Sequence, residues 1–139
     1  MKKLLLLLPL ALVTSCSAGH DLMSDKPFRA DCKAPEDQFS KEDLAKWEAE
    51  GHKNLIRFDV DPSLPQATVE ASTAPVQTFD VVAVSPREIR LASQSLPGIT
   101  VKFLWSIDRE SGEIRSGMRS APGVVTFEKY SLVCKYKSL

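Results

Sequence analysis

Residues 100–108 read TVKFLWSID, and this stretch decides the class of fold. Val101, Phe103, Trp105 and Ile107 occupy every second position, so in an extended chain their side chains share one face. Most of the residues between them are polar. This two-residue period predicts a β-strand with one buried face and one face in water.

Further strands are expected on both sides of this stretch. A hairpin loop follows at residues 110–113, where Gly112 supplies the positive φ that such a loop requires. Similar patterns predict strands at residues 54–60, 76–84, 87–92 and 114–118 and a long final strand after Pro122-Gly123. The final strand changes the parity of its apolar residues, so we expect a β-bulge near Glu128 and Lys129.

Two segments interrupt this pattern of strands. Residues 61–75 contain three prolines and are predicted to form a loop. A helix is expected at about residues 41–50, because Ser40 is a good N-cap and Gly51 suits the left-handed residue that ends a helix. Trp47 belongs to a narrow apolar stripe with which this helix would cover another element. The expected fold is α+β, with one N-terminal helix packed on a curled antiparallel sheet of about five to six strands.

The N-terminus has the order of an export signal. Lys2 and Lys3 precede an apolar segment at residues 4–13, which is shorter than the ~20 residues that span a bilayer. The sequence Val13-Thr14-Ser15-Cys16 resembles the lipobox of bacterial lipoproteins. In that family the cysteine sulfur receives a diacylglyceryl group and the peptide is cut just before it. The alternative is an ordinary secretory signal with a chance cysteine.

The resemblance implies a location and a division of the chain. Lipid on Cys16 would anchor the chain, because two or three acyl chains together hold a protein at a membrane for long times. Ser17, rather than Asp, follows the cysteine, which implies the outer membrane of the bacterial envelope with the domain facing the periplasm. The expected parts are a lipoprotein signal peptide at 1–15, a lipidated flexible tether at 16–31 and one globular domain at 32–139.

With Cys16 lipidated, Cys32 and Cys134 are the two cysteines that remain. Exported proteins fold in an oxidising compartment, where paired thiols persist. We therefore expect a disulfide between them, which would close a loop of about 100 residues. Two buried free thiols are the alternative. A metal site is disfavoured, because two thiolates without a nearby histidine are too few ligands for zinc.

No motif in the sequence indicates catalysis, a metal or a nucleotide. Serine-nucleophile, P-loop, dinucleotide and zinc-protease signatures are missing. An acidic loop from Asp59 to Glu70 has part of a calcium-loop spacing, but Leu64 stands where that loop needs glycine. His20 and His52 have no recognisable catalytic partner. We therefore expect no catalytic residue, no metal, no cofactor and no enzymatic activity.

Residues 105–112 are similar to a strand–turn that recurs in small exported bacterial proteins. An aspartate before a hairpin usually accepts hydrogen bonds from the turn's backbone amides. We therefore assign structural roles to Asp108 and Arg109.

The distribution of charge points to one candidate surface. Without Lys2 and Lys3 of the expected signal peptide, the 18 basic residues of the sequence become 16 against 18 acidic ones, a net charge of −2, which predicts no bulk attraction to nucleic acid. Residues 76–139, however, hold nine basic and six acidic side chains. If the basic ones lie on the outer face of the sheet, they could bind an anionic envelope component or an acidic protein. The residues of this candidate surface are Arg87, Arg90, Lys102, Arg115 and Arg119. The alternative is that they only maintain solubility and protect sheet edges.

The function expected from these features is that of a membrane-anchored envelope lipoprotein, acting as a non-catalytic binding or interaction module. One alternative is an inhibitor of a secreted enzyme such as a lysozyme or a protease. Another is a carrier of a small apolar ligand, with a cavity enclosed by Phe79, Phe103, Trp105 and Phe127. Core packing would explain the same four aromatic residues.

Overall fold

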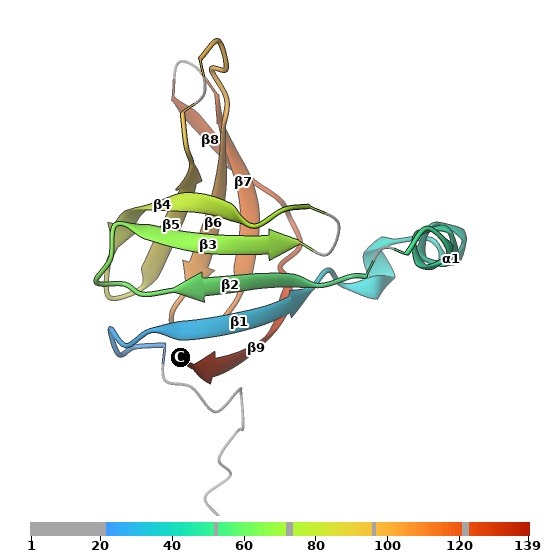
Figure 1. Cartoon of the computed structure of the whole chain (residues 1–139), viewed down its shortest axis with the longest axis horizontal. Coiled ribbons are helices and arrows are strands. Elements are labelled where there is room, and N and C mark those ends of the chain that lie inside the picture. Colours follow the sequence, from blue (N-terminus) through green and yellow to red (C-terminus); the bar gives the residue numbers. More distant parts are fainter. Residues whose placement is uncertain (1–21, 52, 72–73, 96, 121–122) are drawn as a thin grey trace, which may run out of the picture.

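Nine antiparallel strands form one sheet in the computed structural model, which describes residues 22–51, 53–71, 74–95, 97–120 and 123–139 (Figure 1). The strands are β1 (Phe28–Lys33), β2 (Ile56–Val60), β3 (Gln66–Ala71), β4 (Gln77–Val84), β5 (Glu88–Ser93), β6 (Lys102–Asp108), β7 (Ile114–Ser120), β8 (Val124–Phe127) and β9 (Val133–Ser138). They lie in the order β8-β7-β6-β5-β4-β3-β2-β1-β9. A 3₁₀ turn, η1 (Glu36–Gln38), and a helix, α1 (Lys41–Ala49), stand between β1 and β2.

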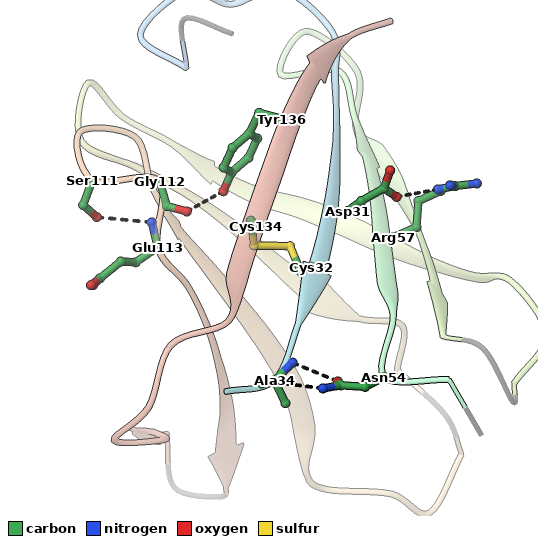
Figure 2. Close-up of a disulfide and its surroundings, with 10 residues drawn as sticks. All are labelled: Asp31, Cys32, Ala34, Asn54, Arg57, Ser111, Gly112, Glu113, Cys134 and Tyr136. Atoms are coloured by element: carbon green, nitrogen blue, oxygen red, sulfur yellow. Dashed lines mark hydrogen bonds and ion pairs between the residues drawn. A yellow bond between two sulfur atoms is a disulfide. The ribbon is translucent and has the colours of Figure 1, made fainter. Parts of the chain in front are cut away.

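The sheet curls into a half-barrel because the two ends of the strand order approach each other. Ile114 at the start of β7 forms a β-bridge with Leu132, just before β9. The Tyr136 hydroxyl of β9 donates a hydrogen bond of 2.6 Å to the Gly112 carbonyl beside β7 (Figure 2). Gly112 has a φ of +76°, as its place in the loop predicted.

The core fills the concave face of this sheet. The two-residue period places alternate side chains inside, as in β2, where Phe58 and Val60 are fully buried. Ile107 and Ile114 from β6 and β7 are also fully buried and pack in the same cluster. Apolar burial of this kind supplies most of the driving force for folding.

The α+β prediction, with one helix packed on a sheet of five to six strands, is wrong. The fold is mostly sheet, and α1 covers no face of it. None of the residues of α1 is buried, and Figure 1 shows the helix standing off the ends of β1 and β2. The helix boundaries themselves agree with the capping signals. The Ser40 hydroxyl accepts a hydrogen bond from the Asp43 amide at 3.1 Å, and Gly51 has a φ of +77°.

Three differences account for the extra strands. β1 occupies residues predicted to be tether, and Leu22 already packs in the core, so the tether prediction is wrong for residues 22–31. β3 lies inside the predicted proline-rich loop, where the prolines flank the strand and do not interrupt it.

The third difference concerns the final strand, which is two strands. After Phe127 the chain stays beside β7, where the Glu128 amide donates to the Ser116 carbonyl at 2.9 Å and Leu132 bridges Ile114, and it then pairs as β9 with β1. Residues 128–132 join the two strands. Gly117 pairs with Phe127 and Ile114 with Leu132, so five residue steps on this part of the chain face three on β7, and the even shift of two keeps the alternation of faces. The apolar residues change parity because Phe127 lies on the outer face and Leu132 lies in the core, and a single β-bulge near Glu128 and Lys129 is therefore wrong.

The Cys32–Cys134 disulfide predicted from the sequence is present (Figure 2). The two cysteines face each other across β1 and β9, with Cα atoms 4.0 Å apart and a sequence separation of 102. The bond ties the first strand of the sheet to the last.

The half-barrel has two different ends. At the closed end, residues 61–65, 85–87 and 109–113 form short connections between neighbouring strands. At the open end, β1 is joined to β2, β3 to β4 and β5 to β6, and the longest of these connections is 34–55.

Arg109 fastens the start of the described chain to the closed end. Its guanidinium donates hydrogen bonds to the carbonyls of Leu22 at 2.8 Å and Ser85 at 2.9 Å. It also bonds to the Met23 and Ser24 carbonyls and to the Asp25 carboxylate. Among the described residues, Arg109 is the one charged side chain that is buried.

Within the described ranges, no helix has both the length and the apolar character needed to cross a membrane.

Candidate functional site

The open end holds a large apolar hollow. This first hollow has a volume of about 410 Å³, which is within the usual range for small-molecule sites. One wall is the segment between β1 and β2, which contributes Phe39, Trp47 and Lys53. The opposite wall belongs to the sheet and includes Trp105 and Leu132.

A second apolar hollow continues the first along the concave face. It has a volume of about 260 Å³ and reaches Phe79 on β4 and Phe103 on β6. The two hollows share four lining residues: Ile56, Ala71, Trp105 and Ser116. The two hollows therefore lie side by side at the open end with Trp105 in the wall that they share, and the pair is called the groove below.

Trp105 is placed in this shared wall by the alternation of β6. It lies on the same face as the buried Ile107, and its ring packs edge-on against Phe58 with centroids 5.0 Å apart. The Trp105 side chain is half-buried, because the groove lies over the ring where a filled core would continue. Indole combines a large apolar surface with one N–H donor, which suits it to a binding wall.

The segment between β1 and β2, residues 34–55, forms an arm beside the groove. Phe39 and Trp47 pack against each other with ring centroids 5.1 Å apart. At the base of the arm, the Asn54 side chain accepts from the Ala34 amide and donates to the Ala34 carbonyl, each at 2.9 Å (Figure 2). This pair of hydrogen bonds joins the two ends of the arm and fixes where it leaves the sheet.

The charge of the groove is simple. Of the described residues that line the two hollows, Lys53 alone is charged. Lys53 already has an interaction within the chain, but its ammonium group carries three N–H donors and can bond a further acceptor on the arm side of the groove. The far side of the groove is lined by apolar and neutral polar side chains. An anionic group would be attracted to the Lys53 side.

The predicted basic surface is assembled only in part. Strand register places Arg90, Lys102, Arg115 and Arg119 together on the outer face of β5, β6 and β7, whereas Arg87 lies in the β4–β5 connection. Two of these arginines form ion pairs with a glutamate two residues earlier in the sequence. Arg90 lies 2.9 Å from Glu88 and also covers the Phe127 ring, and Arg115 lies 3.4 Å from Glu113.

The four aromatic residues predicted to enclose a cavity divide in the structure. Phe79, Phe103 and Trp105 line the groove, and Phe103 is 57% exposed there. Phe127 lies on the outer face instead, where it packs over Gly117 with no room for a Cβ between them.

Asp108 and Arg109 have the structural roles that the sequence indicated. The Asp108 carboxylate accepts hydrogen bonds from the Glu110 and Ser111 amides, each at 2.9 Å. The Ser111 amide is the largest cause of the lowered pKa of Asp108, because it stabilises the charged carboxylate. Burial raises the pKa of the Tyr136 phenol at the same end.

Two groups of sequence predictions lie partly outside the described residues. Cys16, the predicted lipidation site, and both histidines, His20 and His52, belong to positions that the structure does not describe. Among the described residues, no group of three or more His, Cys, Asp or Glu side chains is arranged to hold a metal ion.

No protein-family model, curated protein or solved structure matches this chain.

Proposed function

We propose that this chain is a binding module of the bacterial cell envelope, and that the groove at the open end holds a small apolar ligand. The membrane anchor in this proposal is the lipid implied by the motif that ends at Cys16. The observation that carries the proposal is the first hollow, whose aromatic and aliphatic walls come from both the arm and the sheet. Concave, mostly apolar hollows with a few polar groups are the usual form of small-ligand sites.

The groove supports this function better than the outer face does. Apolar groove surface gains free energy when a ligand removes it from water, by about 25 cal/mol per Å². The outer face offers charges that are partly paired with Glu88 and Glu113 and exposed to solvent. Exposed ion pairs contribute little, because water and salt screen them.

Fluorescence titration tests the proposal, because both tryptophans of the chain, Trp47 and Trp105, line the first hollow. The titrant is N-phenyl-1-naphthylamine, a neutral apolar dye that accepts energy from indole. The protein is residues 17–139, which contain every described residue. We expect saturable binding of one dye per chain, with a loss of tryptophan emission.

Two variants make this titration specific for the groove. Trp47→Ala removes an exposed aromatic wall from a helix that supports no core, and should weaken dye binding by about tenfold. Val82→Ala removes an apolar side chain that is 53% exposed on β4, away from the groove, and should leave binding unchanged. Dye binding that does not saturate, or an affinity for the dye that is unchanged in Trp47→Ala, would contradict the proposal.

A further inference from the structure

We infer that the ligand is a single acyl chain with a carboxylate end, a free fatty acid, lying along both hollows with the carboxylate beside Lys53. This inference rests on the proposed function and specifies the ligand class. Three features of the groove carry it: its length, the side chain in its shared wall and its one charge.

The groove is long and divided. The first and second hollows, of about 410 and 260 Å³, meet at a shared wall in which Trp105 is the largest side chain. A rigid ligand of several fused rings would fill one hollow and leave the other empty. A flexible chain of methylene groups can bend past the indole and cover both, which buries the most apolar surface.

The lining beyond Trp105 has the chemistry of an acyl-chain site. Phe79 and Phe103 present aromatic rings there, and Phe103 is more than half exposed. The polar groups on that side are the neutral side chains of Gln77, Ser93 and Ser116. Methylene groups placed there would cover Phe103 and leave no ionised group buried without a partner.

The charge decides the direction of the chain. Lys53 lines the first hollow from the base of the arm, and its side chain is exposed, so a carboxylate beside it would keep contact with water. The described lining contains no acidic residue that would repel that carboxylate. A charge-assisted hydrogen bond from ammonium to carboxylate is stronger than one between neutral groups.

The test compares oleate, oleyl alcohol and the neutral dye on residues 17–139. Lys53→Gln should weaken oleate binding about fivefold or more beyond any change in the binding of oleyl alcohol and the dye, which carry no negative charge. Lys41→Gln is the matched control, because it removes the same charge from α1 on the same arm but does not line the groove. It should leave all three affinities unchanged.

Brominated stearates then report the direction of the chain, because bromine quenches a tryptophan that it touches. In Trp105→Phe the remaining reporter is Trp47 on the arm, and bromines near the carboxylate should quench it most. In Trp47→Phe the remaining reporter is Trp105, and mid-chain bromines should quench it most. Both substitutions keep an aromatic ring, so the wall of the groove is preserved.

The outcomes separate this inference from the proposed function. If the dye binds and oleate does not, or if oleate ignores Lys53→Gln, the fatty-acid assignment fails and the apolar site stands. The reverse order of bromine quenching would also overturn the inference. If neither oleate nor the dye binds, both the inference and the proposed function fail.

Discussion

The Arg109 side chain makes five polar contacts from a buried position, four to backbone carbonyls and one to Asp25. Arginine suits this place because its planar guanidinium carries several donors in fixed directions. The carbonyls of Leu22 and Ser85 belong to segments far apart in sequence, so one side chain holds the N-terminal segment against the β4–β5 connection. A lysine could not reach as many acceptors from the same position.

Replacing Arg109 with methionine should therefore destabilise the protein strongly. Methionine keeps much of the volume but removes the donor to the buried Leu22 carbonyl and to the part-buried Ser85 carbonyl, and a buried acceptor left unsatisfied costs about 1–3 kcal/mol. We expect the free energy of unfolding in urea to fall by at least about 2 kcal/mol. Arg115→Met is the control, since Arg115 is exposed and forms an exposed ion pair with Glu113, and should change stability by less than about 0.5 kcal/mol. Equal effects of the two substitutions would show that the buried contacts are not stabilising.

The Arg29–Asp59 pair links stability to pH. Arg29 on β1 donates two hydrogen bonds to Asp59 on β2, at 2.6 and 2.8 Å. These hydrogen bonds are the largest cause of the lowered pKa of Asp59, because they stabilise the charged carboxylate. A carboxylate whose pKa is lower in the folded state stabilises the fold above its unfolded pKa. That stabilisation is lost as the pH falls through the folded pKa.

We therefore expect the wild-type protein to lose stability as the pH falls below about 4, and Asp59→Asn to lose less over the same interval. The measurement is urea unfolding at a series of pH values. Asp37→Asn, in the exposed η1 turn, is the control and should follow the wild-type curve. A wild-type slope reproduced by Asp59→Asn would rule out this pair as a source of the acid sensitivity.

At the scale of elements, α1 folds without support from the core. It has no buried residue, and its N-terminus is capped by Ser40 and not by a packed neighbour. A helix of nine residues is marginal in water on its own, so the cap and the Phe39–Trp47 contact matter more here than in a packed helix.

Ser40→Ala should therefore weaken α1 locally and leave the sheet intact. Loss of an N-cap costs about 1 kcal/mol of helix stability. We expect lower helical ellipticity at room temperature, while the urea midpoint of the sheet, followed by Trp105 in a Trp47→Phe background, stays the same. If the sheet's free energy of unfolding instead falls by the same amount of about 1 kcal/mol, helix and sheet unfold as one unit.

Some elements of this fold have a clear local signal in the sequence, and others depend on distant contacts. The boundaries of α1 follow from local contacts at Ser40 and Gly51, which a sequence shows directly. β6 follows from a clean alternation around Trp105. β1 and β3 were missed because short strands with alanine, aspartate and glutamine carry a weak signal and depend on pairing with distant partners.

The candidate site was predictable on its sheet side and not on its arm side. Phe79, Phe103 and Trp105 lie on strands whose faces follow from alternation. Phe39, Trp47 and Lys53 were missed as wall residues because their positions depend on where the arm leaves the sheet. The Asn54–Ala34 hydrogen bonds across the base of the arm decide that, and nothing in the local sequence indicates them.

For the whole molecule, the disulfide is the strongest single constraint on the unfolded chain. It closes a loop of 102 residues, for which the chain-entropy model gives a stabilisation of about 4–5 kcal/mol. The double substitution Cys32→Ala with Cys134→Ala should lower the free energy of unfolding by roughly that amount or somewhat less. The wild-type protein unfolded under reducing conditions is the control and should match the variant. A variant as stable as the oxidised wild type would show that strand pairing alone fixes β1 against β9.

If Cys16 carries the proposed lipid, the Arg109 contacts at the closed end set the orientation of the domain relative to the membrane. Leu22 is held there, only six residues after Cys16, and six residues of extended chain span at most about 20 Å. A lipid on Cys16 would thus hold the closed end of the half-barrel next to the bilayer, with the open end pointing away from it. The groove at the open end would then face the aqueous compartment, one strand length further from the bilayer. Ligands that arrive through water would reach the groove before they reach the membrane.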